Sequence, residues 1–141
     1  MKCKIINGPN LNLLGKRETD IYGDESFDHY LKKLQAKFPT ISLDYFQSNI
    51  EGEIIDELQL SDEKYDGVIL NAGGYTHTSV AIADAIGSMK STVIEVHISN
   101  IMNREQFRTN SLISPKCKGT ITGFGLMGYE LAIYSIAIKG S

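Results

Sequence analysis

Apolar runs along the chain end repeatedly on side chains that can hydrogen-bond or move a proton. The four cases are Ile5-Ile6 before Asn7, Leu43–Phe46 before Gln47-Ser48-Asn49, Val68–Leu70 before Asn71, and Val93–Val96 before His97. In an open parallel sheet the carboxyl ends of the strands line the ligand crevice. We therefore expect these polar side chains to lie at one shared site, which favours an enzyme over a domain with no site.

The same patterning predicts strands that alternate with helices. The predicted strands are 2–7, 41–47, 67–71, 92–97 and 118–122. Helices are predicted at 27–38, at 79–86 and at 126–138. A further helix is predicted to begin at residues 48–51, and a short one near 103–108. Such alternation predicts a parallel, doubly wound sheet. Five strands suit a flavodoxin-like, three-layer α/β/α fold, with residues 1–141 as a single catalytic domain.

Local signals refine three of these segments. Residues Ser48 to Glu51 fit a capping box at the start of the second helix. The helix at 126–138 is apolar on nearly every face, which predicts burial and a contact with another subunit. The loop at 8–23 is longer than most connections, and long loops in compact domains are often lids or binding loops.

Composition and charge narrow the class of protein. The chain has 141 residues, 42% of them hydrophobic, with a net charge of −3 and a pI near 5.6. The basic face that nucleic-acid binding needs is not expected, nor is a membrane span or a signal-peptide core. The two cysteines, Cys3 and Cys117, are expected to be free thiols in a reducing compartment. A cytoplasmic enzyme is the expectation.

The common cofactor-binding motifs give no clear prediction of a cofactor for this chain. Residues 123–128 spell G-x-G-x-x-G, but the strand and acid of a dinucleotide fingerprint do not follow. Close helix packing is the better interpretation of these glycines. The three histidines, His29, His77 and His97, lack the spacing of a metal site. We expect His29 to be a solvated surface residue.

Several titratable residues stand out against this background. Glu95 and His97 are two residues apart in a strand, so both side chains point to one face. A carboxylate beside an imidazole can hold its tautomer and raise its pKa, which prepares a general acid. The alternative is a polar pair on an exposed strand face. His77, also after an apolar strand, is either a structural histidine or a second site residue.

Three further features admit two interpretations each. Asp84 is the sole charge in Val80–Ile86, so it either caps an element or faces a ligand or another subunit. Arg104 and Arg108 form a like-charge pair that an anionic substrate would relieve, unless acids such as Glu105 do so. Arg17 could lower the pKa of Tyr22 by roughly 1–3 units, or the two could be a solvated pair.

Many of these segments, in this order, resemble type II 3-dehydroquinate dehydratase. The matching segments are 7–15, 17–18, 22–23, 47–52, 71–79 with Asp84, 95–100, 104–108, 123–125 and 128–129. The resemblance spans almost the whole chain. Departures are few: Thr19 and Ala72 stand where the family usually has proline, and Gly74 where alanine is usual.

The resemblance implies a cofactor-free enzyme, with no metal, that converts 3-dehydroquinate to 3-dehydroshikimate. Tyr22 would remove the proton alpha to the ketone, with Arg17 favouring its ionised form. Asn10 would help to stabilise the enolate. His97, oriented by Glu95, would protonate the leaving hydroxyl group.

The resemblance also implies how the small anionic substrate and the subunits are arranged. The substrate-binding residues would be Asn71, His77, Arg108, and the backbone at Ile98 and Ser99. Trimers would assemble into a dodecamer, and Asp84 of a neighbouring subunit would reach the site. The alternative from a different class is a flavodoxin-like binding or signalling module without catalysis, because this fold hosts many functions.

Overall fold

The structure is a computed structural model that describes residues 1–16, 20 and 24–139. Within these residues one sheet holds five parallel strands in the order β2-β1-β3-β4-β5. The strands are β1 (Lys2–Asn7), β2 (Ser42–Gln47), β3 (Gly67–Asn71), β4 (Thr92–His97) and β5 (Gly119–Thr122). The predicted doubly wound, flavodoxin-like sheet is confirmed.

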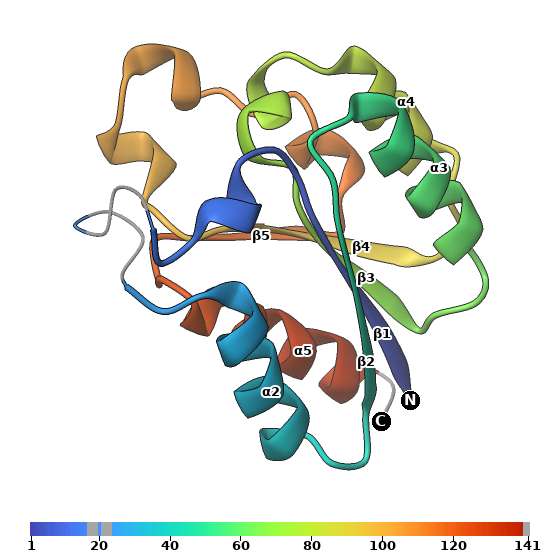
Figure 1. Ribbon diagram of the computed structural model, residues 1–141. Coiled ribbons are helices and arrows are strands. Elements are labelled where there is room, and N and C mark those ends of the chain that lie inside the picture. Colours follow the sequence, from blue (N-terminus) through green and yellow to red (C-terminus); the bar gives the residue numbers. More distant parts are fainter. Residues whose placement is uncertain (17–19, 21–23, 140–141) are drawn as a thin grey trace.

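Helices cover both faces of the sheet, as Figure 1 shows. On one face lie α2 (Phe27–Lys37) and α5 (Met127–Lys139), and on the other lie α3 (Glu51–Ser61) and α4 (Val80–Gly87). Each face has its own apolar core, one built around Tyr129 and Ile133 and the other around Leu58. The central strands β1 and β3 are buried between the two cores, so their carboxyl ends are held rigidly.

Polar caps define where two of the helices begin. Ser26 accepts a hydrogen bond from the backbone N–H of His29 at 3.2 Å at the start of α2. Ser79 accepts one from Ile82 N–H at 2.9 Å at the start of α4. These bonds satisfy backbone donors that the first turn leaves without partners. The second cap fixes α4 directly after the loop that carries His77.

The capping box predicted at Ser48–Glu51 is wrong. Ser48 Oγ accepts from the N–H of Ile50 at 2.9 Å and donates to Glu53 Oε1 at 2.5 Å. The N-cap of α3 is Ile50, whose side chain makes no capping bond. Ser48 lies two residues before that position, so its hydroxyl reaches the amide of the cap residue and not those of the first turn.

The short helix predicted near 103–108 is also wrong. Two 3₁₀ turns, η3 (Ile101–Asn103) and η4 (Gln106–Arg108), replace it. Between them Arg104 and Glu105 adopt extended backbone angles, with ψ at −164° and 147°. The backbone hydrogen bonds of a continuous helix cannot form across such residues. The other 3₁₀ turns are η1 (Leu11–Leu13), η2 (Gly73–His77) and η5 (Ser114–Lys116).

The last helix packs closely on the sheet by one side only. A Cβ added at Gly128 would lie 3.2 Å from Val96 Cγ1, so this glycine permits the close approach that the sequence suggested. Tyr129 and Ile133 are fully buried, whereas Tyr134 and Ile138 are exposed. No helix in the described part of the chain is both long and apolar enough to cross a membrane.

Candidate active site

The polar strand ends meet at one edge of the sheet. In the strand register Asn7 pairs with Gln47 on one side and with Asn71 on the other. His97 ends the next strand and pairs with Thr122. The strand ends meet as the sequence predicts, because parallel strands place their carboxyl ends at one edge, and of the predicted polar residues Asn71 and His97 line the pocket there.

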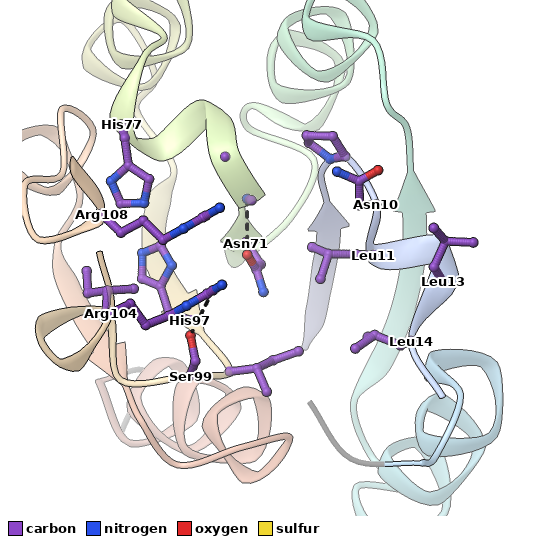
Figure 2. Close-up of a pocket in the computed structure, with 15 residues that line it drawn as sticks. Asn10, Leu11, Leu13, Leu14, Asn71, His77, His97, Ser99, Arg104 and Arg108 are labelled. Atoms are coloured by element: carbon purple, nitrogen blue, oxygen red, sulfur yellow. Dashed lines mark hydrogen bonds between the residues drawn. The ribbon is translucent and has the colours of Figure 1, made fainter. Parts of the chain in front are cut away.

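A pocket of about 190 Å³ opens at this edge. Cationic and polar side chains form one wall, and Asn10 with three leucines forms the opposite wall (Figure 2). The lining residues are Pro9, Asn10, Leu11, Leu13, Leu14, Asn71, Gly73, Gly74, His77, His97, Ile98, Ser99, Ile101, Arg104 and Arg108. The volume is below the roughly 300–1,000 Å³ of pockets for drug-sized ligands, which favours a small molecule.

The charge of the lining favours an anion. Arg104 and Arg108 both reach the pocket, and none of the described lining residues is an acid. Arg104 Nη1 donates to Ser99 Oγ at 3.4 Å. Arg108 Nε donates to Glu105 at 2.5 Å, so the acid that the sequence offered as its alternative partner does bind it. Glu105 is exposed, so an anion bound in the pocket could compete with it for Arg108.

The predicted pair of Glu95 and His97 is confirmed. His97 Nε2 bonds to Glu95 Oε2, and both side chains are buried. A carboxylate only accepts, so Nε2 carries the hydrogen of this bond. The nitrogen left for a ligand in the pocket is therefore Nδ1. In a protonated ring Nδ1 carries the transferable proton.

Burial alone would raise the pKa of Glu95, because it disfavours the charged form. Hydrogen bonds from His97 and Ser114, together with the charge of His97, outweigh the burial and hold this pKa below its usual value. Glu95 is therefore an anion at neutral pH. A fixed negative charge behind the imidazole is the arrangement that supports a proton donor.

His77 lies beside His97 with a different partner. Their ring centroids are 6.4 Å apart and the ring planes differ by 24°. His77 Nδ1 is 2.8 Å from the carbonyl oxygen of Asn110. A carbonyl only accepts, so Nδ1 carries the hydrogen and Nε2 of the neutral ring can accept from a ligand hydroxyl. The structure thus gives His77 a ligand-binding tautomer.

A buried hydrogen-bond network forms the floor. Asn71 Nδ2 donates to Tyr129 Oη at 3.0 Å, and that hydroxyl donates to Asn7 Oδ1 at 2.7 Å. Asn71 Oδ1 accepts from the N–H of Gly73 at 3.2 Å. Both ends of the Asn71 amide are therefore fixed, and its second Nδ2 hydrogen is left for a ligand.

The opposite wall is shaped by amides from β2 and the segment after it. Asn10 has a left-handed backbone with φ at 69°, and its N–H donates to Asn49 Oδ1 at 3.0 Å. Gln47 Nε2 donates to the carbonyl of Gly8 at 3.2 Å and to Asn49 at 3.2 Å. Asn49 and Gln47 therefore hold the first loop in place and present Asn10 to the pocket.

The described residues bring most of the predicted site together. The predicted residues in the pocket lining are Asn10, Asn71, His77, His97, Ile98, Ser99 and Arg108. Glu95 lies behind His97 and touches it. Asp84 is exposed on α4 and is not in the lining. Arg17 and Tyr22 lie outside the described residues.

Sequence reasoning missed part of the lining. Arg104 was singled out only as an anion-seeking charge, yet it lines the pocket beside Arg108. Its place at the start of the same loop was the available signal. Leu11, Leu13 and Leu14 also line the pocket, and three leucines within a loop were a sign that one of its sides is covered.

Comparisons with known proteins agree with this geometry. The family model Dehydroquinase class II matches residues 1–137. A 3-dehydroquinate dehydratase from Campylobacter jejuni is 54% identical over 138 residues, which cover 96% of this chain and 87% of that protein. One from Fusobacterium nucleatum is 53% identical, covering 94% of each chain.

Solved structures give the same result. The type II dehydroquinase from Butyrivibrio crossotus has a TM-score of 0.94 at 45% identity, covering 97% of each chain. The type II dehydroquinase from Propionibacterium acnes has a TM-score of 0.93 at 36% identity, covering 97% of this chain and 96% of that one. Because this family model matches nearly the whole chain, the chain belongs to the class II dehydroquinase family.

Proposed function

We propose that this chain converts 3-dehydroquinate to 3-dehydroshikimate and water through an enolate, without a metal or an organic cofactor. Membership of the family makes it a carbon–oxygen lyase. The observation that carries the proposal is His97, backed by the buried Glu95, in a small pocket whose charged side chains are cationic. Such a site can bind a small anion and donate a proton to it.

The elimination divides into two proton transfers. Tyr22, as a phenolate favoured by Arg17, takes the proton alpha to the ketone, and the electrons of that bond form the enolate. Asn10 lines the wall and supports the enolate oxygen. Return of the electrons expels the hydroxyl group, which takes the proton from His97 and leaves as water. The roles of Tyr22 and Arg17 rest on the family resemblance.

Binding of the substrate rests on the cationic, polar wall and on the floor of the pocket. Arg108 supplies a guanidinium to the polar groups of the substrate, and the backbone at Ile98 and Ser99 binds its carboxylate; all three residues line the pocket. Asn71 offers its remaining amide hydrogen, and His77 offers Nε2 to a substrate hydroxyl. These are short-range polar contacts, so they orient a ring with several oxygen substituents.

The test is direct. Purified protein is mixed with 3-dehydroquinate, and the absorbance of the conjugated enone product is followed from neutral to alkaline pH. We expect a rise in wild type and in His29→Ala, whose histidine is exposed on α2. We expect a large loss in His97→Ala. No rise with wild type across this pH range would refute the proposal.

The division of roles has its own test. Exchange of the alpha proton with deuterated water is measured by NMR for Tyr22→Phe and His97→Gln. We expect Tyr22→Phe to abolish exchange, because removal of that proton needs the base. His97→Gln should retain some exchange, because the first transfer precedes the use of the acid. Equal loss in both variants contradicts the assignment.

We further propose a dodecamer built from trimers, in which Asp84 reaches the pocket of a neighbour. Asp84 is exposed on α4 and outside the lining of its own pocket, which supports a role across an interface. Light scattering should give the mass of twelve chains, and a monomer mass would overturn this. Asp84→Ala should weaken catalysis, whereas Asp56→Ala on the exposed side of α3 should not.

The alternative from a different class is a flavodoxin-like binding or signalling module without catalysis, which bound flavin would indicate. The family match to an enzyme and a pocket of about 190 Å³ both weigh against it. The protein should be colourless and unaffected by added flavin.

The two cysteines, Cys3 and Cys117, are free in the structure, which supports our placement of the enzyme in a reducing cytoplasm.

A further inference from the structure

Three hydroxyl groups outside the pocket lining converge on the carboxylate of Glu95. Ser114 donates to Oε1, and Thr120 Oγ1 lies 3.1 Å from the same oxygen. Ser111 donates to Oε2 at 2.9 Å, the oxygen that also accepts from His97. With these partners both oxygens of a side chain that is 0% exposed are satisfied.

The three hydroxyls are not equivalent. Thr120 Oγ1 is also 3.2 Å from Ser114 Oγ, so its single hydrogen is shared between two acceptors. Ser111 Oγ also accepts from the N–H of Ser114 at 3.1 Å, which ties it to the loop. Ser114 therefore makes the principal bond to Oε1, and the other two hydroxyls support it. Ser111 and Ser114 come from the segment that follows Arg108, whereas Thr120 lies on β5 opposite Glu95 in the sheet.

A buried carboxylate keeps its charge only when donors surround it, because burial favours the neutral form. Charge-assisted hydrogen bonds are about twice as strong as neutral ones. If Glu95 were protonated, it could donate to His97 or to a serine, and the hydrogen on His97 Nε2 would lose its acceptor. The imidazole would then no longer be held with Nδ1 as its free nitrogen.

We propose that Ser114, supported by Ser111 and Thr120, is a positioning residue that keeps Glu95 ionised and so holds His97 ready to donate its proton from Nδ1. This inference rests on the proposed role of His97 as the acid of the dehydration. The inference adds three hydroxyl groups behind Glu95 to the site. It gives Ser114 a role in the reaction, although Ser114 does not line the pocket.

Other titratable groups face this pair from neighbouring elements. His77 stacks beside His97 from η2, and Arg104 and Arg108 reach the pocket from the loop after β4. Cys117 lies near Glu95, and burial together with the charge of Glu95 raises its pKa to about 12. The thiol and the guanidiniums therefore keep one charge state between pH 4 and 8.

The experiment compares four variants with wild type by two measurements. Carbon-13 NMR of labelled glutamate follows the titration of Glu95, and the enone assay gives kcat/KM as a function of pH. Ser114→Ala removes the principal donor, Ser114→Thr keeps a hydroxyl, and Thr120→Val removes the shared one. Ser135→Ala is the matched control, because Ser135 Oγ donates to the carbonyl of Ala132 on the outer side of the fold.

We expect Ser114→Ala to raise the Glu95 titration midpoint by about 1–2 pH units, the equivalent of one hydrogen bond to a charged group. The acid limb of kcat/KM should move to higher pH by the same amount. Thr120→Val should give a smaller shift, and Ser114→Thr should restore the wild-type position. Ser135→Ala should change neither measurement.

The outcomes separate this inference from the proposed function. A wild-type enzyme without activity refutes the dehydratase role, while the NMR titration still tests whether the hydroxyls hold the charge of Glu95. An active enzyme in which Ser114→Ala moves neither the titration nor the acid limb overturns the inference. A loss of stability with an unchanged limb shows that Ser114 only ties the loop. If Ser114→Ala does not fold, an unshifted Thr120→Val overturns the inference.

Discussion

Replacing Tyr129 by phenylalanine removes one hydroxyl group from the floor of the pocket and leaves the aromatic ring in place. Tyr129 is fully buried, and its hydroxyl is both the acceptor for Asn71 Nδ2 and the donor to Asn7 Oδ1. Burial raises the pKa of this phenol, so its proton stays in place to donate. The substitution therefore leaves two buried polar groups without their partner.

The expected cost follows from these two groups. A buried donor or acceptor left unsatisfied costs about 1–3 kcal/mol. Asn7 Nδ2 keeps its 3.4 Å contact with Tyr45, and Asn71 Oδ1 keeps the N–H of Gly73, so the amides stay partly held. We expect a loss of about 2–4 kcal/mol in the free energy of unfolding. That is a large part of the roughly 5–15 kcal/mol of a typical domain.

Urea unfolding at matched protein concentration measures this loss, because subunit assembly would make the apparent stability depend on concentration. Tyr134→Phe on the same helix is the control, since Tyr134 is exposed and should change stability by less than about 0.5 kcal/mol. The enone assay should also show a higher KM for Tyr129→Phe, because Asn71 loses its orientation. If the two variants are equally stable, the network does not hold the floor.

Three further predictions concern packing and pH. Gly8→Ala should cost about 1–3 kcal/mol and reduce activity, because the new Cβ would lie 2.6 Å from the carbonyl oxygen of Ala72. Leu58→Ala should cost about 2–5 kcal/mol by urea unfolding, whereas Leu60→Ala, on the exposed side of α3, should cost little. Glu95 has a lowered pKa, so its contribution to stability is present above the unfolded value of about 4.3 and lost as pH falls through the folded value. The stability of Glu95→Gln should therefore depend less on pH below about 4.3, as acid titration followed by circular dichroism would show.

The parts of the site that the sequence predicts well are those set by strand geometry. Alternation along a strand places Glu95 and His97 on one face whatever the loops do, and the parallel sheet brings Asn71 to the same edge. Both results depend only on the repeat of two residues and on the shared direction of the strands. The helices between successive strands set that direction, so the alternation of elements along the sequence carries the information.

The parts that the sequence predicts poorly are set by contacts between distant segments. The segment after β4 looks helical by spacing, yet Asn100 caps a single turn and the N–H of Leu112 bonds to the carbonyl of Thr76 at 2.9 Å. The two residues are 36 positions apart in the sequence, and no local pattern indicates that they are bonded. Ser48 fails for a local reason, because its hydroxyl donates to Glu53, two residues beyond the Glu51 of the predicted capping box.

The two histidines show why partner identity matters more than position at the strand ends. Both follow apolar strands and their ring centroids are 6.4 Å apart, so their positions alone do not distinguish their roles. His97 faces a buried anion through Nε2, which suits a ring that must carry a positive charge and give up a proton from Nδ1. His77 faces a neutral carbonyl, which selects a tautomer and leaves Nε2 as an acceptor. In the proposed mechanism the partner therefore distinguishes the two rings, because the buried Glu95 carboxylate lies against His97 and a neutral carbonyl lies against His77.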